Sequence, residues 1–251
     1  MTKKQERKDI IIREVSIHNR VLLSDLAEAL NVSSDTVRRD IRELDEQGLL
    51  KQVHGGAIAN GYQLKRPKLM RKVYAARNKQ DIAAKAVHLV QPDSVNLVSG
   101  GTTNLELMRQ LPPKLHATFF TSSIPIALEL MSHPGIELNF LGGRMNPEAQ
   151  IALGGSTINA LTNIRVDNLF LGTGYLDAAF GLSEFDQEII ELKKAMIRSA
   201  RRVISLTISE KLDTTNRYKV CDLSAIHTLV TELDPTDSRL DAYRLPTLKL
   251  I

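Results

Sequence analysis

Several features that assign a chain to a familiar class are missing from these 251 residues. There is a single cysteine, Cys221, which excludes an internal disulfide framework. No apolar run reaches the roughly 18 residues that a membrane span needs, and the amino-terminal MTKKQERKD lacks the apolar core of a signal peptide. The six histidines show no metal-ligand spacing. We therefore expect a cytoplasmic protein without a membrane contact or a metal site.

Charge is unevenly distributed along the chain. Residues 1–80 contain 17 lysines and arginines against 10 aspartates and glutamates, whereas residues 81–251 contain 16 against 19. The net charge is thus +7 in the first part and −3 in the second. Such an asymmetry is typical of a nucleic-acid-binding module attached to a separate domain, because phosphate contacts supply most of the sequence-independent affinity. The length leaves room for one small and one medium domain.

The most informative stretch is VSSDTVRRDIREL, residues 32–44, whose pattern predicts an amphipathic helix. Its apolar residues recur at helical spacing and form one stripe, Val37, Ile41 and Leu44. Ser33 or Ser34 is placed to cap its first turn. The preceding SDLAEALN also has apolar residues at helical spacing, so the two segments together predict a helix-turn-helix. The alternative is an ordinary solvated surface helix.

Residues 48–61, GLLKQVHGGAIANG, hold two short apolar runs separated by Gly55 and Gly56. This pattern predicts a hairpin, or wing, with Lys51 and His54 at its tip. A further helix is expected over residues 5–17, where it would pack on the other two. Three helices and the wing would then form a first domain over residues 1–59.

These residues resemble a known family. VSSDTVRRDIRELDEQGLL followed by VHGGA is similar to the winged helix-turn-helix of the DeoR-type bacterial transcription regulators. The resemblance implies double-stranded operator DNA as a partner, with the second helix in the major groove and the wing on the backbone or the minor groove. The candidate DNA-binding residues are Ser34, Thr36, Arg38, Arg39, Arg42, Lys51 and His54.

The pattern changes after the first domain. Residues 60–79 contain one proline and seven basic residues without steady periodicity, so we predict a linker. Residues 80–251 begin with a helical pattern and then alternate short apolar runs with helical stretches. This alternation predicts βαβ units and a mainly parallel sheet covered on both faces, an α/β domain. Ligands of such sheets bind at the carboxyl ends of the strands.

Small and hydroxyl residues gather where these strands are predicted to end. The ends are followed by SGGTTN at 99–104, TSS at 121–123, GGR at 142–144 and GTG at 172–174. In the first loop, Gly100 and Gly101 let backbone N–H groups converge, Thr102 and Thr103 add hydroxyls, and a helix begins at once. The loop predicts a phosphate-sized anion site, with a tight turn as the alternative. Neither a P-loop nor a dinucleotide fingerprint is present, and we expect no cofactor.

The second domain resembles the same regulators. VNLVSGGTTNLELMRQL, LGGR, VDNLFLGTG, FGLS, LKKAMIRSA and SEK are similar to their effector domain, whose superfamily includes ribose 5-phosphate isomerase and glucosamine 6-phosphate isomerase. The resemblance implies that a phosphorylated sugar binds here, with Lys193 and Lys211 on the anion or the sugar hydroxyls. Lys194, adjacent to Lys193 on a helix, is expected to point elsewhere. The candidate effector-binding residues are Gly100, Gly101, Thr102, Thr103, Thr121, Gly172, Lys193 and Lys211.

The chain departs from the family pattern at several positions. The family usually has Asp, Asn, Asp, Gly, Glu and Asp where this chain has Ser99, Ser122, Gly174, Tyr175, Ile189 and Ile208. Groups that would contact the sugar are therefore missing, which predicts a bulkier or less hydroxylated effector, or a pocket partly filled by Tyr175. Isomerisation needs a carboxylate base, and Glu184, Asp186 and Glu188 lie outside the family motif, which weakens an enzymatic interpretation.

From these features we predict a transcription regulator, a repressor of carbohydrate genes whose operator binding responds to a phosphorylated sugar. No catalytic residue is assigned. A homodimer or homotetramer is expected, because two-fold operators suit two-fold proteins. Two alternatives stay open: a sugar-phosphate isomerase-like enzyme with an appended DNA-binding domain, and a regulator whose effector pocket no longer binds a ligand.

Overall fold

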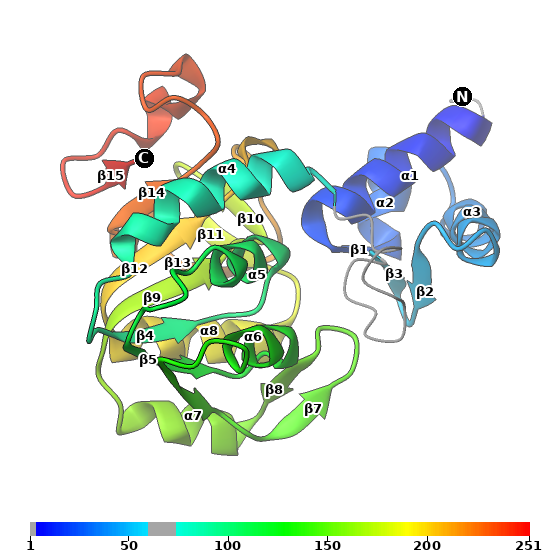
Figure 1. The fold of residues 1–251 in the computed structure, drawn as a ribbon. Helices are drawn as coiled ribbons and strands as arrows, with labels where there is room; N and C mark the ends of the chain where they lie inside the picture. Colours follow the sequence, from blue (N-terminus) through cyan, green and yellow to red (C-terminus); the bar gives the residue numbers. More distant parts are fainter. Residues whose placement is uncertain (1–3, 60–73) are drawn as a thin grey trace. The chain divides into compact units, whose positions relative to one another are not determined.

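The computed structural model describes residues 4–59 and 74–251, which fall into two compact units that divide between residues 74 and 75 (Figure 1). Most of the predicted linker, residues 60–73, lies outside the described residues. Its last part belongs to helix α4 (Ala76–Ala86), which begins before the position that the pattern predicted. The reason is that Lys79 shares the buried face of this helix with Ile82 and Ala83.

The first unit contains helices and a three-stranded antiparallel sheet in the order β1-β3-β2. Its elements are α1 (Lys4–His18), β1 (Arg20–Leu22), α2 (Leu23–Ala29), α3 (Ser34–Glu46), β2 (Lys51–Val53) and β3 (Gly56–Ile58). The three helices share one core, which includes Ile11, Val15, Val37, Ile41 and Leu44. The predicted winged helix-turn-helix is thus confirmed. Strand β1 escapes detection in the sequence because it is only three residues long.

The wing corrects one prediction. Strands β2 and β3 pair around a turn at His54 and Gly55, and Gly55 has the positive φ of +77° that a tight hairpin turn needs. His54 therefore lies at the tip, as predicted. Lys51 does not, because it pairs with Ile58 at the opposite end of the hairpin.

A seven-stranded parallel sheet forms the centre of the second unit, in the order β15-β14-β12-β9-β4-β5-β6. Its strands are β4 (Val95–Val98), β5 (Ala117–Thr121), β6 (Ile136–Phe140), β9 (Val166–Gly172), β12 (Ala200–Leu206), β14 (Thr228–Val230) and β15 (Lys249–Leu250). The predicted α/β sheet is confirmed. The strand order runs outward in both directions from the adjacent strands β4 and β9, and ligands bind at such a switch point.

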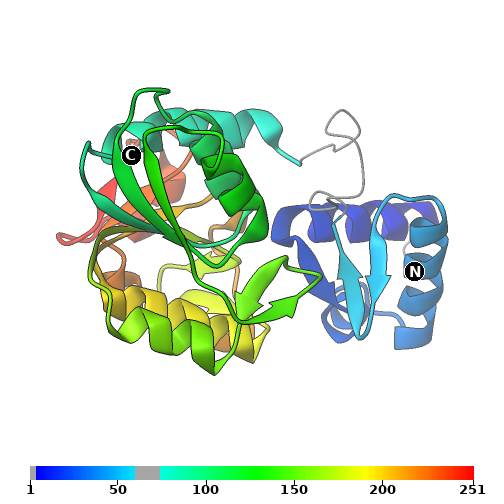
Figure 2. The same ribbon diagram turned by 60° about the horizontal axis from the view of Figure 1, so that its bottom comes forward.

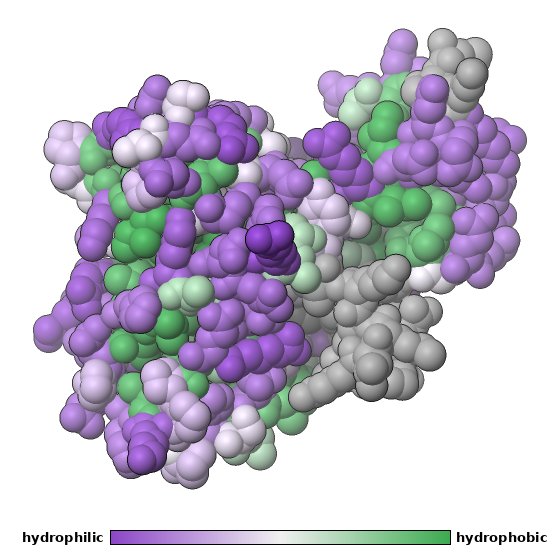
Figure 3. Space-filling view, turned by 45° about the horizontal axis from the view of Figure 1, so that its top comes forward, coloured by the Kyte–Doolittle hydropathy of each residue, from purple (hydrophilic) through white to green (hydrophobic). Residues whose placement is uncertain are grey.

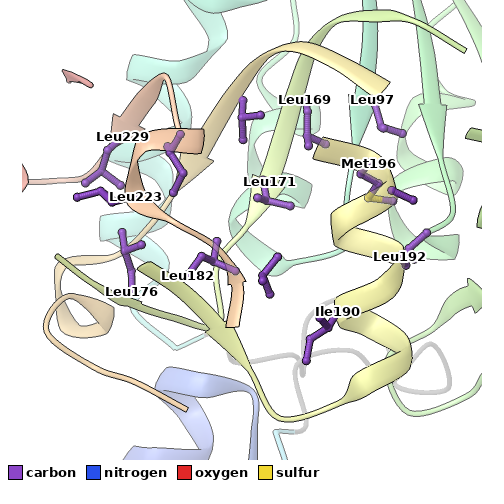
Figure 4. Close-up of a cluster of buried hydrophobic side chains, with 14 of the residues drawn as sticks. Leu97, Leu169, Leu171, Leu176, Leu182, Ile190, Leu192, Met196, Leu223 and Leu229 are labelled. Atoms are coloured by element: carbon purple, nitrogen blue, oxygen red, sulfur yellow. The ribbon is translucent and has the colours of Figure 1, made fainter. Parts of the chain in front are cut away.

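Helices cover both faces of this sheet, with α4, α5 (Thr102–Arg109) and α6 (Ile124–Leu130) on one face and α7 (Gly155–Thr162) and α8 (Gln187–Ser199) on the other (Figure 2). Figure 4 shows Leu192 and Met196 of α8 in the buried cluster that also contains Leu97 of β4 and Leu169 of β9. Single-turn and short 3-10 helices complete the unit, η3 (Val87–Leu89), η4 (Ser209–Lys211), η5 (Leu223–Ala225) and η6 (Ser238–Tyr243).

Two small antiparallel sheets extend the strand ends. One consists of β10 (Tyr175–Asp177), β11 (Gly181–Glu184) and β13 (Tyr218–Cys221), and the other of β7 (Arg144–Asn146) and β8 (Ile151–Leu153). Strand β10 follows β9 and strand β7 follows β6 after a few residues, so both small sheets begin at the carboxyl edge of the main sheet. Their strands are too short for the sequence alternation to predict them.

The surface is mostly polar. On the face drawn in Figure 3, hydrophilic side chains predominate and hydrophobic ones occur in patches between them. Among the large hydrophobic residues that the structure describes, Met131, directly after α6, is the most exposed. Within residues 4–59 and 74–251, no helix is long and apolar enough to cross a membrane.

Candidate DNA-binding and effector-binding sites

Helix α3 presents the polar face that was predicted to bind DNA. Ser33 rather than Ser34 caps it, because the Ser33 hydroxyl accepts a hydrogen bond from Thr36 N at 3.3 Å. The Thr36 hydroxyl is 2.9 Å from that of Ser33, so it takes part in the same cap. The other six candidates are exposed, namely Ser34, Arg38, Arg39, Arg42, Lys51 and His54.

The three arginines of α3 are held only weakly by their own unit. Arg38 forms an ion pair with Asp35 at 2.5 Å, and 48% and 76% of the two side chains are exposed. Such an exposed pair contributes little stability. Arg39 Nε donates to Asp35 O at 3.4 Å, and the Arg42 side chain makes no hydrogen bond or ion pair with another described residue. A DNA phosphate can therefore replace these contacts with little loss.

An ionic network that the sequence analysis did not predict holds α3 on α1. The buried Asp40 accepts two hydrogen bonds from Arg7, from Nε at 2.6 Å and from Nη2 at 3.2 Å. Glu43 accepts bonds from Lys4 at 2.8 Å and from Lys8 at 2.7 Å, and these two bonds lower the pKa of Glu43 to about 2. An acidic residue within the apolar stripe of the helix is the sequence feature that points to this network.

The loop between β4 and α5 is fixed to the neighbouring strand β9. Asn104 Nδ2 donates to Ser99 O at 3.0 Å and to Phe170 O at 3.1 Å. The Ser99 hydroxyl accepts a bond from Gly172 N at 2.7 Å. Gly101 has a φ of 135°, which side-chain-bearing residues rarely adopt. The loop is therefore rigid and places the start of α5 at the switch point of the sheet.

Helix α5 begins directly after this loop at Thr102, which is buried, while Thr103 is half-buried. The N–H groups of the first helical turn have no acceptor within the helix, and the helix dipole attracts an anion to them. Gly100 and Gly172 approach closely, since a Cβ on Gly172 would lie 2.4 Å from Gly100 O. The structure thus brings these predicted effector residues together at one edge of the sheet.

The loop after β5 adds two hydroxyl groups to this edge. Thr121 Oγ1 donates to Val98 O at 2.7 Å and accepts from Ser123 N at 3.1 Å, so this candidate residue already has structural bonds. The buried hydroxyls of Ser122 and Ser123 have no hydrogen-bond partner among the described residues. A Cβ on Gly100 would lie 3.7 Å from Ser123 Oγ, so the two loops adjoin. Buried polar groups are normally paired, and these two hydroxyls are therefore candidate ligand donors.

Two lysines donate hydrogen bonds to consecutive backbone carbonyls at the end of β9. Lys193 of α8 donates to Gly172 O at 2.8 Å and forms a buried ion pair with Glu184 of β11. Lys211 of η4 donates to Thr173 O at 2.5 Å and makes no ion pair with another described residue. Lys194 points elsewhere, as predicted, and pairs with a glutamate on the surface of α8.

Burial lowers the pKa of two lysines, Lys211 and Lys79. Lys211 is buried, and this burial, followed by repulsion from Lys79, lowers its pKa to about 7. Burial also lowers the pKa of Lys79 to about 8, although the charge of Glu210 opposes the shift. Lys79 was not a candidate, because it fell in the predicted linker. Its position three residues before Ile82, on the apolar face of a helix, is the feature that could have placed it here.

Several family positions that this chain has changed are enclosed by protein. Tyr175 and Ile208 are buried and Ile189 is half-buried. Gly174 lies against Glu184, since a Cβ on Gly174 would be 2.5 Å from both carboxylate oxygens. Within the described residues, no group of three or more His, Cys, Asp or Glu side chains could hold a metal ion.

Comparison with known protein families identifies the two domains that contain these sites. Residues 7–63 match the model of the DeoR-like helix-turn-helix domain, and residues 75–233 match that of the DeoR C terminal sensor domain. The chain belongs to the DeoR family. It is a DNA-binding transcription regulator with a sensor domain and not an enzyme, and the resemblance in the sequence is confirmed.

Relatives of this DeoR-family chain are named as repressors. It is 29% identical to the HTH-type transcriptional repressor GlcR of Bacillus subtilis, over 94% of this chain and 92% of the relative. It is 26% identical to the glycerol-3-phosphate regulon repressor of Escherichia coli K12, over 93% and 92%. Among solved structures it is similar to ribose 5-phosphate isomerase A of Methanocaldococcus jannaschii, with 19% identity, 53% of each chain covered and a TM-score of 0.40.

Proposed function

We propose that this DeoR-family regulator represses genes of carbohydrate metabolism and that a phosphorylated sugar, bound at the carboxyl edge of the main sheet, controls its binding to operator DNA. The observation that carries this proposal is Lys211, a buried cation that bonds one backbone carbonyl and makes no ion pair with another described residue. A buried charge is normally paired. A phosphate would supply the missing counter-charge.

Neighbouring groups support an anion at this edge. The first turn of α5 directs backbone N–H groups and its dipole toward the strand ends. The loop after β5 adds the buried hydroxyls of Ser122 and Ser123, which have no partner among the described residues. The E. coli relative is named for a phosphate ester, glycerol 3-phosphate. Similar ligand chemistry in the present chain is consistent with these donors.

On the DNA side, the exposed arginines of α3 would contact bases or phosphates in the major groove, with Ser34 and Thr36 at the start of the helix. His54 at the wing tip would reach the minor groove, whereas Lys51, at the other end of the hairpin, would contact a phosphate. A two-fold operator requires two such units, so we propose that the protein acts as a homodimer or homotetramer in the cytoplasm. The effector would shift the balance between conformations that bind and release DNA.

A gel-shift titration tests the proposal. The wild-type protein is titrated against DNA from its own upstream region with and without three- to six-carbon sugar phosphates, and at least one ester should change the apparent Kd. Lys193→Ala should bind DNA normally and lose this response, whereas Lys194→Ala should keep it. A wild-type protein that binds DNA but responds to no phosphate ester would refute effector control.

A further inference from the structure

Positions 174 and 184 are separated in the sequence but adjacent in the structure, at the carboxyl edge of the main sheet where the effector is proposed to bind. Strands β10 and β11 are antiparallel, with Tyr175 opposite Ser183, and continuing this register places Gly174 opposite Glu184. Both oxygens of the Glu184 carboxylate lie 2.5 Å from the point where a Cβ on Gly174 would be. The carboxylate therefore fills the space that a side chain at position 174 would occupy.

This arrangement concerns one departure from the family pattern, the glycine at position 174. An aspartate at position 174, as the resemblance described above leads one to expect, would overlap with Glu184 and place two carboxylates together. In this chain glycine stands at position 174, and a carboxylate reaches the same place from strand β11. The carboxylate thus comes from position 184 instead of position 174, but it occupies the same place in the structure.

The carboxylate has capacity left for a ligand. Lys193 is the side chain that bonds it, and in the described part of the chain no second hydrogen-bond donor reaches it. Lys193 uses a second proton on Gly172 O and keeps a third. About a tenth of each side chain stays exposed, 9% for Glu184 and 10% for Lys193. A carboxylate and an ammonium side by side offer an acceptor and a donor, which suits vicinal hydroxyl groups.

We propose that Glu184 is a specificity-determining residue of the effector site, whose carboxylate, held by Lys193, accepts hydrogen bonds from hydroxyl groups on the carbon chain of the effector. The inference rests on the proposed function, because it assumes a ligand at this edge of the sheet. It deepens that function by assigning the side chain that selects for the hydroxyl groups of the effector. This proposal differs from the expectation of a less hydroxylated effector, and the experiment below decides between the two.

Two variants and a control separate this role from a structural ion pair. Glu184→Gln keeps the shape of the side chain and removes its charge. The double variant Gly174→Asp with Glu184→Thr moves the carboxylate back to position 174. Glu191→Gln removes an exposed carboxylate of α8 and serves as the matched control. Each protein is titrated by calorimetry with a panel of sugar phosphates and with methyl phosphate, which has the ester phosphate but no hydroxyl group.

Glu184→Gln should weaken the binding of the sugar phosphate by about tenfold, the effect of one charge-assisted hydrogen bond, and change the Kd for methyl phosphate less than twofold. The double variant should regain most of the sugar-phosphate affinity, and Glu191→Gln should behave as wild type. Equal weakening of both ligands by Glu184→Gln, or of neither, would overturn the inference and leave the proposed function intact. A wild-type protein that binds neither ligand would instead refute both.

Discussion

Replacing Lys211 with methionine should stabilise the second unit and abolish its response to phosphate esters. Burial lowers the pKa of this lysine from 10.5 to about 7. At about 1.36 kcal/mol per pKa unit, this pKa shift lowers the free energy of unfolding by about 4 kcal/mol at pH 7. Methionine is unbranched and of similar length, so it removes this cost and loses about 1 kcal/mol for the hydrogen bond to Thr173 O. The expected net gain is about 3 kcal/mol.

The stability gain of Lys211→Met should decrease as the pH rises. Between the folded pKa of about 7 and the ordinary value of 10.5, the unfolded chain binds a proton that the folded chain does not. The stability contributed by Lys211 therefore rises with pH in this window, and its cost is complete below pH 7. The advantage of Lys211→Met should be largest below pH 7 and nearly vanish by about pH 9.5.

Thermal melts at pH 6, 7, 8 and 9.5 measure this difference. A gain of about 3 kcal/mol corresponds to a rise in Tm of roughly 6 to 12 °C for a unit of this size. Lys194→Met, on the exposed part of α8, is the control and should show no pH-dependent gain. A Lys211→Met variant that is less stable than wild type at pH 7, or whose gain is equal at every pH, would contradict the assignment of Lys211 as a buried, poorly compensated cation.

Three further predictions concern other parts of the chain. Arg38→Ala or Arg39→Ala should each weaken operator binding by about 1 to 3 kcal/mol per lost base contact in gel-shift titrations; unchanged binding would exclude α3 as the reading helix. Asp40→Asn removes the buried charge that the half-buried Arg7 bonds and should destabilise the first unit by about 1 to 3 kcal/mol in denaturant titrations, unlike the exposed Asp35→Asn. Gly101→Ala forces a φ of 135° on alanine and should lower the free energy of unfolding by about 1 to 3 kcal/mol. The variant should also lose the phosphate response, and thermal shift measures both effects.

The fold could be predicted where a pattern runs over enough residues. The stripe of Val37, Ile41 and Leu44 identified α3, and the apolar runs identified β4, β5 and β9 within a residue or two of their ends. Strands such as β1 and β10 have three residues each, and their pairing depends on contacts with distant segments. Local periodicity contains no information on such contacts, so these strands appear only in the folded chain.

The location of the candidate effector residues was predictable where they are neighbours in the sequence, while their role in binding stays a prediction. The glycines and threonines after β4 form one loop, so Gly100 to Thr103 could be located from the sequence alone. Lys79 is harder to place, because it lies among basic residues and only its spacing three residues before Ile82 indicates burial on the apolar face of a helix. Glu184 lies outside the family motif, and only the pairing of β10 with β11 shows that its carboxylate lies beside position 174.

The buried lysines also suggest how an effector could act through this edge. Lys193 and Lys211 bond the carbonyls of consecutive residues, Gly172 and Thr173, just before β10 begins. An anion that attracts either ammonium group competes with those carbonyls, so the backbone before β10 has different partners in the free and the bound protein. Because an anion also raises the pKa of a neighbouring lysine, binding should take up protons, and phosphate-ester affinity measured by calorimetry should fall as the pH rises above about 7. Affinity that is constant from pH 6 to 9 would place the anion away from Lys211.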